Sequence, residues 1–467
     1  MGGAGGTLFG TLLTGLDDRE HLMATYSWER DLIYSGPAIV LSMMTFALVV
    51  YIPAFYATET GLSLAAVGAA FFAARLWDAV IDPLIGFYSD KTQTRWGRRK
   101  LWIALGAPLL LASAWWLFVP DSESAETISY LLITIFLFYV FWTAVQIPYL
   151  SLGAELSSDY SERSRIVGFR ESAMFVGTIL ATAVPAFAFT TGDPTIGQIL
   201  ALFFQMSLVI LPITVLLLMW KVPEPKRTEV NMPTLRETAL VLLRNRLFLR
   251  LNVAAFLLWL GLHVYNAGAL LVIQYQLELP TSIFLQLVLI QFAVGLIMNP
   301  LLIRLANRWG KHRALGLSAI LVSLSLPLLA VLPASDKSWA MAIFALLGIT
   351  ISPIWVLPTA LVADAVDLGK FRGGGDQSGI YMAIYNLMVK FALALSVGIA
   401  LPLMQFFGFD PKSGQGVDAL VGITLFLPAA AFLPAAWLLF TYPLDQRRLV
   451  TVQRWLARPS LRTPFKS

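Results

Sequence analysis

Residues 75–100, RLWDAVIDPLIGFYSDKTQTRWGRRK, place charges inside an apolar run and then end in a dense basic loop. Arg75, Asp78 and Asp82 all precede the first turn signal of this stretch. A charged side chain at the centre of a bilayer costs about 2.5–3.5 kcal/mol on insertion scales, so such residues almost always face a bundle interior or a water-filled cavity. The stretch therefore indicates a membrane helix with a functional site on one face.

The composition is that of a protein that crosses the membrane many times. Hydrophobic residues make up 58% of the 467 residues and charged residues only 13%, against about 25% charged in soluble domains. The sequence has no cysteine, which excludes disulfides and thiolate metal sites. The three histidines are dispersed and the basic residues lie in short loops, so we expect neither a His-rich metal site nor a nucleic-acid partner.

Twelve stretches are long and apolar enough to span a bilayer, which takes about 20 residues per helix. They are 35–57, 63–89, 101–119, 127–154, 165–190, 197–220, 247–277, 281–305, 314–333, 338–363, 377–407 and 417–441. We therefore expect an all-α membrane protein with two pseudo-symmetric six-helix halves. Its parts would be an N-terminal tail at 1–34, a first bundle at 35–220, a linker at 221–246, a second bundle at 247–441 and a C-terminal tail at 442–467.

Lysine and arginine gather in the loops on one side of these spans, and cytoplasmic loops are enriched in both. That side holds the two tails, the linker and Lys91, Arg95, Arg98, Arg99, Lys100, Arg163, Arg165, Arg308, Lys311, Arg313, Lys370 and Arg372. The opposite loops hold only Lys337 and Lys412. Both termini are therefore expected to be cytoplasmic.

An internal repeat relates the two halves. RWGRRK at 95–100 recurs as RWGKHR at 308–313, and Glu155 and Asp364 follow the fourth and tenth spans at nearly the same offset. Parallel halves related by an axis along the membrane normal are a transporter architecture, with the substrate near the midplane between them.

The basic loops of this repeat can bond carboxylates and carbonyl groups at the ends of neighbouring helices. They would hold the cytoplasmic mouth in one state and release it in the other. The residues of this expected gate are Asp90, Arg95, Arg98, Arg99, Arg308 and Lys311. Topology marking alone is the alternative interpretation, and the two are compatible.

The Gly-rich stretch at 369–379, GKFRGGGDQSG, lacks the spacing and the Lys-Ser/Thr end of a P-loop. We interpret it as a hinge before the eleventh span. With neither an ATP site nor a catalytic constellation in the sequence, transport would be secondary and the protein would not be an enzyme.

Three segments carry a resemblance to a known family. AARLWDAVIDPLIGF…TRWGRRKLWI, QIPYLSLGAEL…ERSRIVGFR and WVLPTALVADAVDLGKF resemble the glycoside–pentoside–hexuronide:cation symporters, the melibiose-permease-like branch of the major facilitator superfamily. The match spans both halves, with the motifs in the right order. The resemblance implies the major facilitator fold and a cation-coupled mechanism.

Asp78 and Asp82 are one helical turn apart, and with Arg75 they share one face of a helix. Paired carboxylates supply oxygen ligands for Na⁺, or share a proton because they repel one another. In the family that the chain resembles, the matching positions carry the carboxylates for the coupling cation, and Thr143 matches a further position near that site. The alternative is a structural Arg75–Asp78 ion pair with Asp82 as a cap before Pro83.

Lys390 lies in the middle of the eleventh span, where an ammonium group needs a partner from another helix. The two aspartates are the obvious candidates. The family has a lysine at the matching position, close to both cation and substrate. Arg170 matches a family arginine that lines the cavity, and the alternative is an arginine that snorkels to the membrane interface.

Gln146 is a departure from the family pattern. Sugar-carrying members have an acidic residue there and another on the first helix, where residues 35–57 carry none and Ser42 lies near the expected position. Carboxylates accept hydrogen bonds from sugar hydroxyls, so their loss argues against a galactoside. The QIPY segment also resembles the lysolipid-carrying animal relatives. Gln146 remains a candidate for substrate binding, as do Tyr149, Trp355, Tyr381, Tyr385 and Asn386, for which the alternative is packing.

These observations favour a secondary transporter that couples Na⁺ or H⁺ to a small polar solute, a sugar, glycoside or uronide, by alternating access. The alternatives are a carrier of lysolipids or other amphiphiles and a non-transporting membrane sensor on the same fold. We expect no cofactor or metal beyond the coupling ion. The protein would be a monomer in the bacterial inner membrane, with the lipid bilayer and a small-molecule substrate as its partners.

Overall fold

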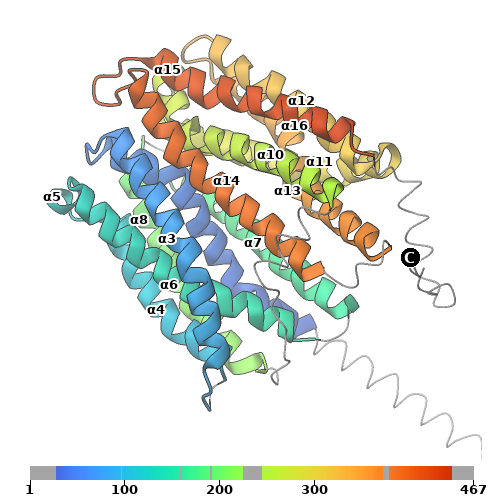
Figure 1. The fold of residues 1–467 in the computed structure, drawn as a ribbon. Helices are drawn as coiled ribbons and strands as arrows, with labels where there is room; N and C mark the ends of the chain where they lie inside the picture. The colour runs from blue at the N-terminus through green and yellow to red at the C-terminus, as the bar shows by residue number, and fades with distance from the viewer. Residues whose placement is uncertain are drawn as a thin grey trace, which may run out of the picture.

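A computed structural model describes residues 28–95, 97–157, 160–189, 192–224, 245–371 and 378–443. Within these residues the chain forms twelve helices long and apolar enough to cross a membrane, six on either side of the linker (Figure 1). This confirms the expected fold class.

The first half contains six spans. The first span runs over Trp28–Thr58 and is wound as a π-helix at Ala47–Tyr51 before it ends as α2, Ile52–Thr58. The other five are α3, Leu64–Lys91; α4, Arg99–Phe118; α6, Ile128–Glu155; α7, Tyr160–Ala188; and α8, Ile196–Lys221. The short α5, Ser122–Ala125, lies between α4 and α6.

The second half repeats this arrangement. Its first three spans are α10, Arg246–Leu271, extended by a π-helix to Gln276; α11, Thr281–Trp309; and α12, Lys311–Ser325, extended by a 3₁₀ helix to Val331. The last three are α13, Lys337–Phe371; α14, Ser378–Phe406; and α15, Val417–Val421, which continues through a π-helix into α16, Leu427–Phe440.

The expected bound of the N-terminal tail was wrong, because the first helix begins at Trp28 and not at residue 35. The charged residues there are paired: Asp31 is fully buried and lies 2.8 Å from Arg30 and 2.7 Å from Arg165 of α7. Paired charges let the helix extend past the apolar run. The linker segment 225–244, the Gly-rich hinge residues 372–377 and the tail segments 1–27 and 444–467 lie outside the described residues.

The two halves meet where α3 packs on α14 and α7 on α11, and α10 also contacts the end of the first span, at the π-helix Ala47–Tyr51 and α2. In Figure 1 the halves appear as a blue-to-green group and a yellow-to-red group. A small residue permits close approach in the first pair, because a Cβ at Gly68 would lie 2.5 Å from the ring of Pro402. This pairing places the charged face of α3 against α14.

We call the end of the bundle that carries the RWGRRK and RWGKHR loops the basic end, and the other the far end. At the far end, the N–H of Ala65 donates to Gln405 at 2.7 Å and the N–H of Ser282 donates to Asp193 at 3.1 Å. Among the described residues, the remaining hydrogen bonds between the halves come from Lys390, near the midpoint of its helix. The halves are thus hydrogen-bonded at the far end and the middle.

Candidate functional site

A cluster of four charged side chains lies in the middle of the bundle. Asp78 and Asp82 project from the same face of α3, as their spacing of one turn requires. The helix continues through Pro83 to Lys91, so Asp82 is not a helix cap. Asp78 is buried, with 3% of its surface exposed, while Asp82 is half-buried.

Thr143 of α6 joins the two carboxylates. Its Oγ1 lies 3.0 Å from Oδ1 of Asp78 and 3.2 Å from Oδ1 of Asp82, and its side chain is fully buried. A hydroxyl has one proton to donate but two lone pairs. Here it can donate to one carboxylate at a time, and its oxygen faces the same space as theirs.

Lys390 approaches the carboxylates from the other half of the protein. Its Nζ donates to Oδ2 of Asp78 at 3.3 Å and also forms an ion pair with Asp82. Arg75 adds a second cation, with Nη1 3.8 Å from Oδ2 of Asp78. Two cationic and two anionic groups therefore balance, and the Arg75–Asp78 pair exists within the larger cluster.

The guanidinium of Arg75 is held on its other side by an aromatic face. It lies over the ring of Tyr139 at 4.7 Å from the centroid, and Tyr139 is itself buried in the first half. A cation over an aromatic ring is attracted by the ring quadrupole. Arg75 is thus fixed to its own half, whereas Lys390 must move with the opposite half.

Side-chain exposure rises through the cluster, from 4% for Asp78 to 19% for Asp82 and 36% for Lys390. The deepest carboxylate is the one with the most polar contacts. The carboxylate and hydroxyl oxygens form a set of hard ligands that suits an alkali cation or a proton. Among the described residues, no group of three or more His, Asp or Glu side chains is arranged to hold a metal ion.

A cavity of about 140 Å³ lies between the halves, with lining residues from both. Aromatic and aliphatic side chains form most of its wall, with a few neutral polar groups. It is lined by Ser42, Thr45, Phe46, Val49, Val50, Met174, Thr178, Leu262, His263, Tyr265, Asn266, Ala269, Phe284, Val288, Gln291, Phe292 and Trp355. Its position between the two halves is the one expected for the substrate site of a transporter built from two repeats.

Of the aromatic substrate candidates, Trp355 lines this cavity, with 47% of its surface exposed. Tyr149 instead stacks on Tyr34 at 4.8 Å in the core of the first half. Tyr381 is buried in the second half and accepts a hydrogen bond from Asn245 at 2.8 Å. In this conformation Tyr149 and Tyr381 are packing residues.

The polar candidates lie on several helices. The amide oxygen of Gln146 accepts a hydrogen bond from the Trp142 indole one turn earlier, at 2.8 Å. Asn386 is exposed one turn from Lys390 on α14. Arg170 lies 2.5 Å from the carboxylate of its neighbour Glu171. Asn386 therefore shares α14 with Lys390, and Gln146 shares α6 with Thr143.

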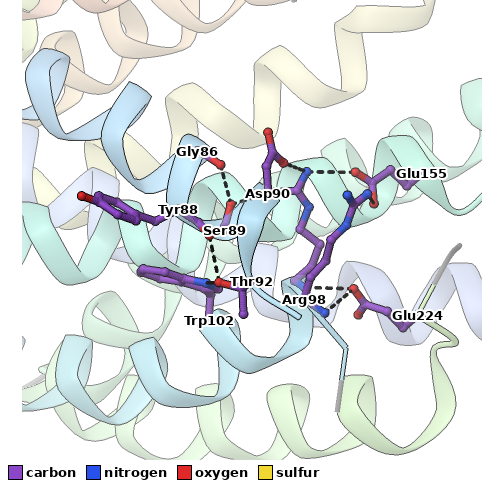
Figure 2. A network of polar contacts seen from close by, with 10 residues as sticks. Gly86, Tyr88, Ser89, Asp90, Thr92, Arg98, Trp102, Glu155 and Glu224 are labelled. Carbon is purple, nitrogen blue, oxygen red and sulfur yellow. Dashed lines mark hydrogen bonds and ion pairs between the residues drawn. The ribbon is translucent and has the colours of Figure 1, made fainter. Parts of the chain in front are cut away.

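The basic end of the first half holds a dense network, shown in Figure 2. Glu155 at the end of α6 lies 2.8 Å from Arg98 and 3.0 Å from Arg99. Arg99 also pairs with Asp90 and donates to Ser89 at 2.7 Å. These contacts join α3, α4 and α6.

Glu224 closes the same network from the start of the linker (Figure 2). Its carboxylate accepts the backbone N–H groups of Arg98 at 3.0 Å and Arg99 at 2.9 Å. These N–H groups begin α4 and have no partner within the helix. A carboxylate at this position also complements the positive end of the helix dipole.

The second half contains a reduced copy of this network. Lys311 corresponds to Arg98 in the repeat and lies 2.7 Å from Asp364, which corresponds to Glu155. The preceding glycines, Gly97 and Gly310, share a φ of 98°, in the region that favours glycine. The repeat therefore conserves a turn and an ion pair, each within its own half.

The other two basic residues of the expected gate lie outside these ion pairs. Arg308 is exposed on α11. Arg95 is also exposed, in the loop before α4. The described pairs at the basic end join helices within one half, so gating across the halves remains a prediction.

Sequence reasoning missed Glu224, Trp259 and His263. Glu224 stands in a proline-rich segment that reads as linker. Trp259 and His263 are one turn apart on α10, and Asn266 lies three residues further on the same face. That spacing of polar and aromatic residues inside an apolar helix was the available signal.

Comparison with known proteins gives a consistent result. Residues 33–446 match the family described as MFS/sugar transport protein. The isoprimeverose transporter of Lactiplantibacillus pentosus is 24% identical over 86% of each chain. The glucuronide carrier protein homolog of Escherichia coli (strain K12) is 23% identical over 90% of this chain and 94% of its own.

A third relative and a solved structure extend the comparison. The sodium-dependent lysophosphatidylcholine symporter 1 of Xenopus tropicalis is 21% identical over 89% of this chain and 85% of its own. The crystal structure of the nucleoside transporter NupG superposes with a TM-score of 0.67 at 12% identity, over 90% of this chain and 100% of its own. This similarity supports the fold.

Proposed function

The chain belongs to the MFS/sugar transport protein family, and from this premise we propose that it couples the movement of a cation to that of a small polar solute. The cation is Na⁺ or H⁺, and its ligands are Asp78, Asp82 and Thr143. No cofactor takes part beyond this ion. The protein alternates between conformations that open to either side of the membrane.

One observation carries the proposal: Lys390 of one half contacts both aspartates of the other. A cation that binds between the carboxylates competes with the Lys390 ammonium for the same oxygens. Cation binding therefore alters a contact that holds the halves together. Coupling requires this kind of differential interaction of each ligand with the two states.

The orientation follows from the distribution of basic residues. We place the basic end, both termini and the linker in the cytoplasm, because lysine and arginine mark cytoplasmic loops. We infer that this conformation is the inward-facing one, because the halves are hydrogen-bonded at the far end. We assign the protein to the bacterial inner membrane as a monomer.

The substrate that these features favour is a sugar, glycoside or uronide. The cavity combines neutral hydrogen-bonding groups with the exposed indole of Trp355, and sugar rings pack against such aromatic faces. A lysolipid is the second candidate, because Phe46, Phe284 and Phe292 make much of the wall apolar.

Proteoliposome uptake tests the proposal. Purified protein is reconstituted, an inward Na⁺ or H⁺ gradient is imposed, and uptake of isoprimeverose, methyl glucuronide and lysophosphatidylcholine is measured. We expect one solute to accumulate above its external concentration under one gradient and to equilibrate without it. Binding without uptake would support a sensor, and no binding of any solute would contradict the assignment.

A further inference from the structure

His263 is a buried polar residue that the charged cluster does not use. It lies on α10, lines the cavity and has 7% of its surface exposed. Neither ring nitrogen has a hydrogen-bond partner. A buried polar group without a partner is costly, and native structures usually supply it with water or a ligand.

The orientation of the imidazole is fixed by its neighbours. Its ring stacks on Trp259 with centroids 5.5 Å apart. Trp259 in turn donates its indole N–H to Tyr385 at 3.0 Å and meets Trp355 edge-on at 5.0 Å. The indole donor is therefore occupied, while both imidazole nitrogens are buried and without a hydrogen-bond partner beside the cavity that the residue lines.

The surroundings select the chemistry of the ligand. The polar side chains that line the cavity with His263 include Ser42, Thr45, Asn266 and Gln291, all neutral. No Asp, Glu, Lys or Arg is among its described lining residues. A neutral imidazole offers one donor and one acceptor, which matches a hydroxyl group better than a carboxylate or a quaternary amine.

We propose that His263 is a substrate-binding residue that exchanges hydrogen bonds with a hydroxyl of an uncharged glycoside. The exposed face of Trp355 packs against the sugar ring beside it. This inference rests on the proposed transport function and narrows its substrate class to neutral sugars, ahead of uronides and lysolipids. It also adds a hydrogen-bonding residue of the second half to Trp355 and Lys390.

Two substitutions separate hydrogen bonding from packing. His263→Leu removes both polar atoms at similar volume, and His263→Gln restores a donor and an acceptor. The probes are isoprimeverose, methyl glucuronide and lysophosphatidylcholine, and binding is measured by calorimetry in saturating Na⁺. His312→Gln is the matched control, since His312 is also buried but lies at the basic end.

We expect wild type to bind isoprimeverose more tightly than the other two. His263→Leu should weaken that binding about tenfold or more, as expected when a ligand hydroxyl loses its buried partner. His263→Gln should recover most of the loss, and His312→Gln should match wild type. The Na⁺ affinity should change less than about twofold in all three variants, since the cation ligands are untouched.

Chemical labelling gives a readout that needs no substitution. Diethyl pyrocarbonate modifies accessible imidazoles, and peptide mass spectrometry assigns the modification to each histidine. His263 is buried in this conformation, so its labelling requires the cavity to open; the rate of that labelling should fall when isoprimeverose is bound, while the rate for His312 should not change. A His263 labelling rate that is equal with and without solute contradicts the inference.

The outcomes distinguish this inference from the proposed function. If isoprimeverose binds wild type and His263→Leu equally, or if only methyl glucuronide or lysophosphatidylcholine binds wild type, the His263 assignment is wrong and the transport proposal stands. If none of the three binds wild type, both are wrong.

Discussion

Nζ of Lys390 lies 3.3 Å from Oδ2 of Asp78, although 312 positions of sequence and the boundary between the two halves separate them. The contact sets a lysine from α14 against a carboxylate from α3 at the middle of the bundle. Arg75 reaches the same oxygen atom at 3.8 Å from its own helix. The contacts of Asp78 therefore depend on how the two halves are placed relative to one another.

Replacement of Lys390 by methionine should uncouple the two ligands. The substitution removes the charge that competes with the cation and keeps an unbranched side chain. Coupling between two ligands is typically about 5- to 150-fold in affinity, and in Lys390→Met we expect the cation to change solute affinity about twofold or less. Solute affinity measured across a Na⁺ and pH series in wild type and variant tests this.

Lys390→Arg is the matched control for that experiment, because it keeps the positive charge. It should retain more of the coupling than Lys390→Met. An equal coupling factor in wild type and Lys390→Met would make Lys390 a structural counter-ion and would refute the competition mechanism.

Neutralisation of either aspartate of α3 should abolish concentrative uptake. Asp78→Asn and Asp82→Asn each leave the cation with one carboxylate and Lys390 with an excess of positive charge. Asp78→Asn should lower thermal stability more, because its side chain is 4% exposed against 19% for Asp82, and removal of one partner of a buried ion pair is strongly destabilising.

Asp418→Asn is the control for both variants, since Asp418 is an exposed aspartate at the far-end start of α15. It should accumulate solute like wild type. Gradient-driven accumulation at the wild-type level in Asp78→Asn and Asp82→Asn would remove the cation site from the mechanism.

Thr143 offers a test of the cation ligands that leaves every charge in place. Thr143→Val has the same shape without the hydroxyl, whereas Thr143→Ser keeps the hydroxyl. A hydrogen bond to a charged group contributes about 1.5–3 kcal/mol, so the valine variant should lose about tenfold or more in Na⁺ affinity. The serine variant should stay within about threefold, since its hydroxyl still reaches both carboxylates. Identical Na⁺ titrations of the two variants would show that the hydroxyl is no ligand.

Gly97 should be sensitive to substitution for two separable reasons. Its φ of 98° is strained for other residues, and an added Cβ would lie 2.5 Å from the Glu224 carboxylate. Gly408 has a φ of 96° with no atom within 4 Å of an added Cβ, so Gly408→Ala measures strain alone. That strain costs about 1–3 kcal/mol, and Gly97→Ala should lower the melting temperature further. Equal melting temperatures would mean that Glu224 moves aside freely.

The parts of the site that follow from spacing within one helix were accessible from sequence. Asp78 and Asp82 share a face because they are one turn apart. An ammonium group such as that of Lys390 is costly in hydrocarbon without an ion-pair partner, so a partner on another helix was expected. The structure places these groups together. The twelve spans followed from apolar run length, except where paired charges, as at Asp31, let a helix continue beyond the run.

Relationships between helices were not accessible in this way. Tyr149, Trp355 and Tyr381 are all aromatic residues on apolar helices, yet only Trp355 lines the cavity. The direction in which each ring points depends on the rotation of its helix against neighbours, which periodicity in one helix does not determine. Glu224 is a similar case. Its own segment shows no helical periodicity, and its role comes from its contact with the N-terminus of α4, which is distant in the sequence.

The ion pairs of the repeat provide the last prediction. Arg98–Glu155 and Lys311–Asp364 each join helices within one half, at 2.8 Å and 2.7 Å. Glu155→Gln and Asp364→Asn should therefore lower the melting temperature additively, as distant independent sites do. If the freed cations form a common gate when the basic end closes, the two substitutions act on one step, and their effects on turnover should depart from multiplicative behaviour by about twofold or more, a coupling above about 0.5 kcal/mol. Uptake rates and melting temperatures of both single variants and the double variant measure the two cycles.

Glu59→Gln at the far end, where Glu59 accepts from the N–H groups that begin α8, controls for loss of an acidic helix cap. Additive effects on both turnover and stability would show that the repeat stabilises each half separately and that the basic loops are not a gate.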